Sequence, residues 1–152
     1  MFKKSTLLKL MNFWPPYLGA GIRIKKMEPD FRFIEVEMKL RFWNRNYVGT
    51  QFGGSMYSMV DPFFMLMLIE NLGRDYIVWD KAATIRFKKP GTGRVVAKFH
   101  LSKEQIEDYR AQADQNHKVE PVLRVDILND AGEVIAEVDK TLYIRRKDRV
   151  WK

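Results

Sequence analysis

Hydrophobic and polar residues alternate along several short segments of the chain. The clearest is residues 34–42, "IEVEMKLRF", in which every second side chain is apolar. This period of two predicts a β-strand with one buried face and one solvent-facing side. The same alternation predicts strands around residues 83–87, 95–101, 123–127 and 134–144, and Lys140 interrupts the last series. Residues 20–27, "AGIRIKKM", are a weaker strand candidate.

Two turn sequences separate neighbouring members of this series. "PGTG" at 90–93 and "NDAGE" at 129–133 contain the residues that tight turns favour. Each is flanked by alternating segments, so we expect each to connect an antiparallel hairpin.

Three other segments are predicted to be helical. Residues 55–72 show no alternation, and 63–69 are apolar at every position, which predicts a helix buried on all sides. A short polar helix is expected after Ser102, because a Gln follows three positions later as in a capping box. An N-terminal amphipathic helix with Leu7, Leu10 or Met11, and Trp14 on one face is expected to stop at Pro15 and Pro16. The fold predicted from these elements is α+β, an antiparallel sheet curled around one long central helix within a single domain, 1–152.

Composition narrows the classes of partner. The chain has 152 residues and no Cys, so neither disulfides nor thiolate chemistry is expected, and a cytoplasmic location is the default. The net charge of +8 favours anionic partners in general. The central apolar run is shorter than the roughly 20 residues of a membrane span, and a nucleic-acid-binding module is only a distant alternative. His100 and His117 lack the spacing of metal ligands, so no metal site is expected.

The segment "NYVGTQFGGSMYSMVD" before the apolar run resembles the site of the hotdog-fold acyl-coenzyme A thioesterases. The positions that fall in the register of that family are Asn46, Gly49, Thr50, Gly53, Gly54 and Asp61. Phe52 stands where many members carry His. The chain is also similar to a branch of the fold that has "NYVGTQFGGS" followed by an Asp-Pro step. The resemblance implies a hotdog homodimer or homotetramer that acts on acyl-coenzyme A, with no cofactor other than the coenzyme A of the substrate.

The candidate catalytic residues each have an alternative structural explanation. Backbone N–H groups of Gly53 and Gly54 at a helix start could hold a thioester carbonyl, or the two glycines could only allow a tight turn and close packing. Asp61 could activate water or attack the carbonyl itself. It could also be the N-cap of a second helix that has Pro62 at its first position. Asn46 could orient water, although Asn is equally suited to a turn.

The candidate substrate-binding residues are Asp80, Lys88, Lys89 and Arg94. Asp80 lies near where similar proteins carry a second polar group, but it could simply pair with Lys81. The three basic residues flank the "PGTG" turn and could bind coenzyme A phosphates or be solvated.

Helix geometry bears on how such a site is assembled. Gly53 and Asp61 are eight residues apart, which is about 12 Å along a continuous helix. One thioester cannot contact both residues of one chain, so the sequence predicts a site shared by two chains. A thioesterase is the function expected. The alternative is a non-catalytic acyl-coenzyme A or fatty-acyl binding protein, which Phe52 and the flexible side chains of eight methionines favour.

Overall fold

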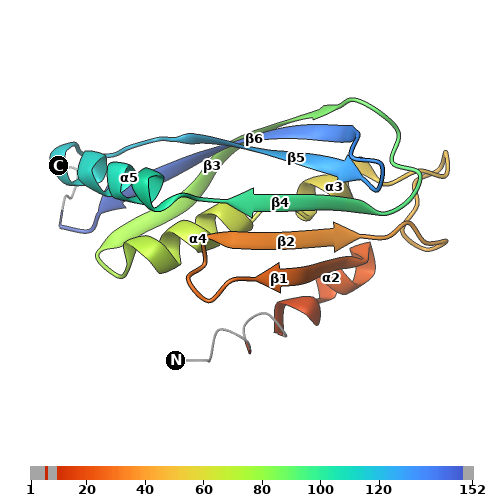
Figure 1. Cartoon of the computed structure of the whole chain (residues 1–152), viewed down its shortest axis with the longest axis horizontal. Helices are drawn as coiled ribbons and strands as arrows, with labels where there is room; N and C mark the ends of the chain where they lie inside the picture. Colours follow the sequence, from red (N-terminus) through yellow and green to blue (C-terminus); the bar gives the residue numbers. More distant parts are fainter. Residues whose placement is uncertain (1–5, 7–9, 149–152) are drawn as a thin grey trace.

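The computed structural model describes residue 6 and residues 10–148 (Figure 1). Its strands are β1 (Ile22–Met27), β2 (Phe33–Met38), β3 (Tyr76–Phe87), β4 (Val95–His100), β5 (Val122–Asn129) and β6 (Val134–Arg146). Its helices are α2 (Pro15–Ala20), α3 (Gly53–Ser58), α4 (Phe63–Leu72) and α5 (Lys103–Gln115). The strands form one antiparallel sheet in the order β1-β2-β4-β5-β6-β3. The expected α+β architecture is confirmed.

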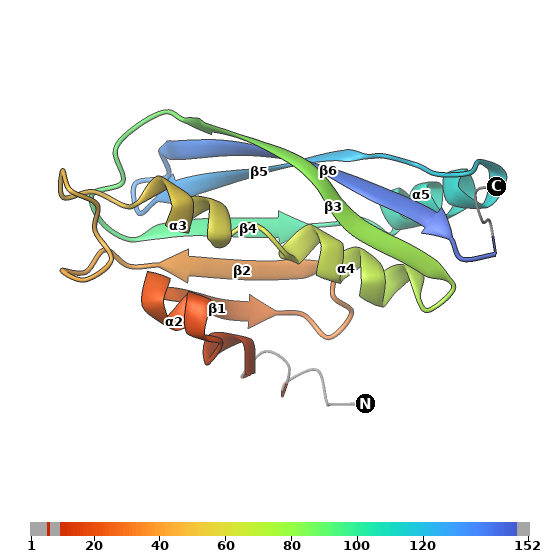
Figure 2. The ribbon, with the colours of Figure 1, turned by 180° about the vertical axis from the view of Figure 1, so that it is seen from behind.

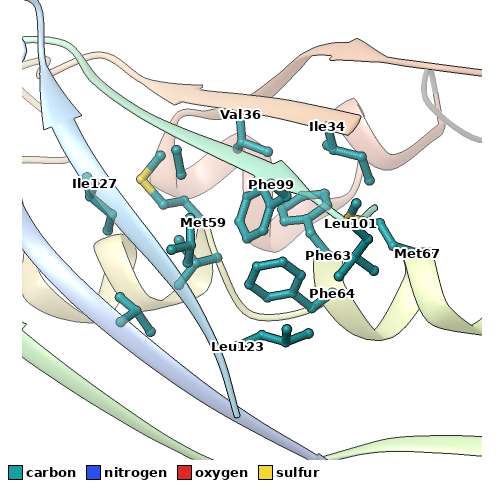
Figure 3. Packing of buried hydrophobic residues seen from close by; sticks show 14 of the residues in the cluster. Ile34, Val36, Met59, Phe63, Phe64, Met67, Phe99, Leu101, Leu123 and Ile127 are labelled. Carbon is teal, nitrogen blue, oxygen red and sulfur yellow. The ribbon is translucent and has the colours of Figure 1, made fainter. Parts of the chain in front are cut away.

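The core lies between the sheet and the helices α3 and α4, which follow one another along the same face of the sheet (Figure 2). Phe63 and Phe64 of α4 pack on Phe99 of β4, each with ring centroids 5.1 Å apart (Figure 3). Ile34 and Val36 of β2 are fully buried, as their alternation predicts. Burying such side chains contributes about 1.5–3 kcal/mol each, so this layer holds the helices on the sheet.

The central helix is interrupted at residues 59–62, so it consists of α3 and α4, as the alternative of a second helix beginning at Pro62 allowed. Ser58 Oγ donates a hydrogen bond to the Gly54 carbonyl (2.9 Å), and Pro62 has no N–H with which to continue the helical ladder. The second helix, α4, begins after Pro62, whose carbonyl accepts from Leu66 N–H (2.9 Å). Asp61 therefore lies in the bend between two helices, and its side chain does not cap α4.

Only one of the two expected hairpins is correct. "NDAGE" connects β5 to β6, which pair directly. "PGTG" does not connect neighbours, because β3 pairs with β6 whereas β4 pairs with β2 and β5. The chain crosses the sheet between β3 and β4. Alternation predicts which face a strand buries, but it does not specify the neighbouring strand.

Strand β3 also differs in burial. Ala83 and Phe87, predicted on a buried face, are both exposed, and 54% of the Phe87 side-chain surface is accessible. They lie on β3, the last strand of the sheet, which within residues 10–148 has β6 as its single neighbour.

At the other edge of the sheet, β1 confirms the weaker strand candidate, and the predicted strand from residue 34 to 42 ends at Met38, so Leu40 and Phe42 fall outside it.

The remaining expected helices are present with altered bounds. Ser102 and Gln105 form the predicted capping box at the start of α5. Residues 10–12 are helical and the chain leaves that helix before Trp14, but Leu7 and most of this N-terminal segment lie outside the described residues. Pro15 and Pro16 follow the end of that helix and also form the first turn of α2. Proline is tolerated there because the backbone N–H groups of a first turn have no partner within the helix.

Candidate functional site

A cavity of about 460 Å³ opens beside the start of α3. It brings together four residues predicted from the sequence, Asn46, Gly53, Lys88 and Lys89, although the last two follow β3 and lie far from Gly53 in the chain. Its apolar lining residues include Val48, Met56 and Phe87. The cavity thus combines a helix start, two ammonium groups and an apolar wall.

The two glycines at the start of α3 are in close contact with aromatic rings. A Cβ on Gly53 would lie 2.9 Å from the ring of Phe87, and one on Gly54 would lie 2.7 Å from the ring of Phe52. Close packing alone therefore explains the absence of side chains here. The first backbone bond across α3 runs from Met56 N–H to the Phe52 carbonyl (3.0 Å), so the N–H groups of both glycines precede the helical ladder.

Asn46 shapes the loop that leads to α3. Its Nδ2 donates to Thr50 Oγ1 (2.9 Å), and its Oδ1 accepts from the Thr50 backbone N–H (2.9 Å). Gly49, between them, has a φ of 85°, a conformation that L side chains rarely adopt. Both ends of the Asn46 amide are used within the loop, which favours the turn interpretation of this residue.

Asp61 is held by two donors on the same oxygen. Tyr57 OH, one helical turn earlier, donates to Oδ1 at 2.9 Å, and Lys140 Nζ donates to the same atom at 2.9 Å. Lys140 comes from β6 and is fully buried. In the sequence, Lys140 was noted only because it interrupts the alternation of residues 134–144. A charged residue at a core-facing position needs a buried partner, and that was the available signal.

Asp80 contacts the same lysine instead of Lys81. Its Oδ1 lies 3.1 Å from Lys140 Nζ, while Lys81 pairs with Glu120 at 2.8 Å. That Oδ1 atom is buried, and no donor within the described chain reaches it with good hydrogen-bond geometry. Burial raises the pKa of the Asp80 carboxyl, and the Lys140 charge opposes this rise without cancelling it.

The pKa values of Lys140 and Tyr57 are shifted as well. Burial by itself lowers the pKa of Lys140, but the hydrogen bond and charge of Asp61 and the charge of Asp80 outweigh it, so the pKa lies above its usual value. Burial, together with the hydrogen bond to Asp61, raises the pKa of Tyr57. We refer to Tyr57, Asp61, Asp80 and Lys140 as the lysine cluster. It is one ammonium group shared by two carboxylates and a phenol.

Asp61 and Gly53 face different cavities in one chain. Asp61 lines a small cavity of about 130 Å³ together with Tyr17, Tyr57 and other residues of α2 and the helix bend. That lining shares no residue with the cavity beside Gly53. Because the helix is broken between Gly53 and Asp61, the rise of a continuous helix does not give the distance between them. The two residues nevertheless line separate cavities.

The three basic candidates are all ion-paired. Lys88 lies 3.2 Å from Glu137 and Lys89 pairs with Glu133, with both lysine side chains about half exposed at the cavity rim. Arg94 does not line this cavity. It contacts Glu37 at 2.9 Å and Asp130 at 2.8 Å, and these carboxylates raise its pKa.

A six-stranded antiparallel sheet wrapped around central helices is the hotdog fold, and the chain has the architecture of the thioesterase-like hotdog proteins. Its sequence matches the family described as a domain of unknown function, DUF4442, over residues 3–144, and the chain belongs to that family. The sequence matches no curated protein.

Solved structures support the same fold. A protein from Pseudomonas aeruginosa, described as a probable thioesterase, is 21% identical with a TM-score of 0.82, and the match covers 95% of this chain and 97% of that one. A protein of unknown function from Chlorobaculum tepidum is 17% identical with a TM-score of 0.74, over 94% of each chain. A thioesterase from Haemophilus influenzae is 16% identical with a TM-score of 0.68, over 96% of this chain and 92% of the other. Within residues 10–148, no helix is long and apolar enough to cross a membrane.

Proposed function

We propose that the protein hydrolyses acyl-coenzyme A thioesters. The observation that carries this proposal is the cavity whose lining combines the start of α3 at Gly53, the basic residues Lys88 and Lys89, and apolar side chains. A thioester needs these three environments, because its carbonyl gains negative charge on attack, its coenzyme A carries phosphates and its acyl chain is apolar. The thioesterase-like relatives from Pseudomonas aeruginosa and Haemophilus influenzae support the same class of reaction.

In the proposed reaction, the thioester carbonyl oxygen accepts hydrogen bonds from the N–H groups of Gly53 and Gly54. Asp61 removes a proton from a water molecule, whose oxygen bonds to the carbonyl carbon, or its carboxylate attacks that carbon directly. The carbon–sulfur bond then breaks, and the coenzyme A thiolate leaves and takes up a proton. In the second route, water hydrolyses the resulting anhydride.

A second copy of the chain is needed to bring these groups together, since Asp61 and Gly53 line different cavities. We expect that copy at strand β3, which lies at the end of the sheet and leaves Ala83 and Phe87 exposed. Such an open edge favours pairing with another strand. Antiparallel pairing of two β3 strands about a two-fold axis would place equivalent surfaces of the two chains opposite each other and give two equivalent sites.

The alternative is a non-catalytic acyl-coenzyme A binding protein. Phe52, which takes the place of the family's His, is the observation that favours it, because its ring covers Gly54. A release assay for free thiol, run on acetyl-, octanoyl-, palmitoyl- and benzoyl-coenzyme A, separates the two functions. We expect release from at least one substrate and none from Gly53→Val, in which the new side chain would enter the cavity. Tight binding by calorimetry with no thiol release would establish the alternative.

A further inference from the structure

Lys140 occupies a position where an apolar residue would be expected. On β6 it follows Val138 and precedes Leu142 in the row of fully buried side chains, and all three have no accessible surface. Its neighbours across the sheet, Ala83 on β3 and Leu123 on β5, are apolar. Burying an ammonium group costs several kcal/mol unless partners compensate, and replacing a buried ion pair by apolar residues is often neutral or stabilising. Stability alone therefore gives little reason for a lysine here.

The contacts of Lys140 are arranged asymmetrically around Asp61. Lys140 and Tyr57 both donate to Oδ1, and within the described chain neither they nor any other donor reaches Oδ2. The Asp61 side chain is 47% exposed, so this carboxylate is held through Oδ1 and remains accessible to solvent. A carboxylate with one oxygen fixed and the other accessible is oriented for reaction at the accessible one.

Lys140 also separates two negative charges. Its Nζ lies 2.9 Å from an oxygen of Asp61 and 3.1 Å from an oxygen of Asp80, so those oxygens are no more than about 6 Å apart. Two carboxylates at that range disfavour each other's ionised form. Asp80, from β3, is 23% exposed and provides the second charge that keeps the ammonium in place.

We propose that Lys140 is the positioning residue of the Asp61 carboxylate, fixing Oδ1 and leaving Oδ2 to face the reacting groups. Asp80 anchors Lys140, and loss of the ammonium would leave two neighbouring carboxylates with no cation between them. The other titratable groups that face Asp61 are Tyr57 from α3 and Tyr17 from α2, whose pKa is raised by burial and by the Asp61 charge. The consequence for turnover rests on the proposed thioester hydrolysis, whereas the effect on ionisation does not.

The test is a carboxyl-detected NMR titration of Asp61 and Asp80 in the wild type, Lys140→Met and Lys140→Met with Asp80→Asn. Methionine is unbranched like lysine, one atom shorter, and carries no charge. We expect one carboxyl of the pair in Lys140→Met to titrate at least about one pH unit higher than in the wild type, and the double variant to reverse most of that shift. Lys26→Met, which removes an exposed lysine of β1 paired with Glu28, should leave both titrations unchanged.

An unshifted titration in folded Lys140→Met, or no reversal in the double variant, would overturn the proposal. If Lys140→Met does not fold, Asp80→Asn decides instead. Its Asp61 should then titrate at lower pH than in the wild type because Lys140 serves it alone, and an unchanged titration would contradict the inference.

The pH dependence of kcat/KM provides the link to the reaction. In Lys140→Met, the acidic limb of this profile should move to higher pH by the same amount as the NMR titration, and in the double variant it should move back. A lysine with a purely structural role would not produce this pattern. If the wild type releases no thiol from any substrate, the proposed function fails, while the NMR titration still decides the role of Lys140.

Discussion

A mixed dimer of two inactive chains should regain activity if each site uses Gly53 of one chain and Asp61 of the other. The two variants are Asp61→Asn, which lacks the proposed base, and Gly53→Val, whose Cβ would lie 2.9 Å from the ring of Phe87, a residue of the cavity wall, and would displace it. Gly53 is a better choice than Asn46, because Asn46 makes hydrogen bonds that hold its loop and its loss would disturb more than one group.

The size of the recovery follows from the separate cavities of the two residues. In a mixed dimer, one site combines the intact Gly53 of one chain with the intact Asp61 of the other, and the second site carries both lesions. Random pairing of equal amounts makes half of the dimers mixed, so we expect about a quarter of wild-type activity.

The assay is thiol release after the two variants are unfolded together and refolded, with chains of different mass so that native mass spectrometry counts the mixed dimers. Each variant refolded alone serves as the control and should remain inactive. A mixture as inactive as its parents, with mixed dimers present at the random proportion, would refute a site built from two chains.

Three further predictions concern single features. Asp61→Asn should lower kcat about 100-fold, because the variant keeps the shape of the side chain and loses its basicity, as steady-state thiol release would show. Lys88→Glu with Lys89→Glu should raise KM for acyl-coenzyme A in a salt-dependent way and leave kcat unchanged, measured between low and moderate ionic strength. Ser102→Ala should lower the free energy of unfolding by about 1 kcal/mol through loss of the α5 cap, measured in urea, whereas Ser102→Thr should keep most of it.

Matched controls distinguish these effects from general changes in charge. Asp126→Asn removes an exposed aspartate that is paired with Arg124, and it should leave kcat unchanged. Lys25→Glu with Lys26→Glu makes the same charge change at the far edge of the sheet, on β1. If that pair raises KM as much as the Lys88 and Lys89 variant does, the cavity lysines have no specific contact with the substrate.

The fold could be predicted from the sequence to the extent that it depends on local pattern. Alternation identified the buried faces of β2, β4 and β5, and the Ser102 capping box placed the start of α5. The partner of β3 could not be predicted, because "PGTG" is a suitable hairpin turn and only the assembled sheet shows that the chain crosses to β4. The Asp61-Pro62 step was a visible sign that a second helix could begin there, but local pattern did not decide between that start and one continuous helix.

The candidate site was predicted only for residues that a local sequence pattern identifies. Asn46, Gly53, Lys88 and Lys89 line one cavity, and their membership of a functional site and their roles remain predictions. The lysine cluster was not found, since Lys140 is 79 residues from Asp61 in the sequence and meets it only in the fold, where α3 and α4 lie against the sheet that contains β6 (Figure 2). Nothing near Asp61 in the sequence indicates a cation.

The pairing of β3 with β6 also has a consequence for how the chain folds during synthesis. When β3 has been made, both of its edges are open, because β1, β2 and β4 pair among themselves and the only neighbour of β3 in the described structure follows at Val134–Arg146. At the usual 5–20 residues per second, the ribosome adds the residues between Phe87 and Val134 in roughly 2 to 9 s. For that time the twelve-residue strand, which carries Trp79 and Phe87, has no partner strand. Its open edges can then pair with another nascent chain unless synthesis of β6 is fast or a chaperone covers β3. The last strand to be made then closes the sheet and delivers Lys140 to Asp61 in the same step.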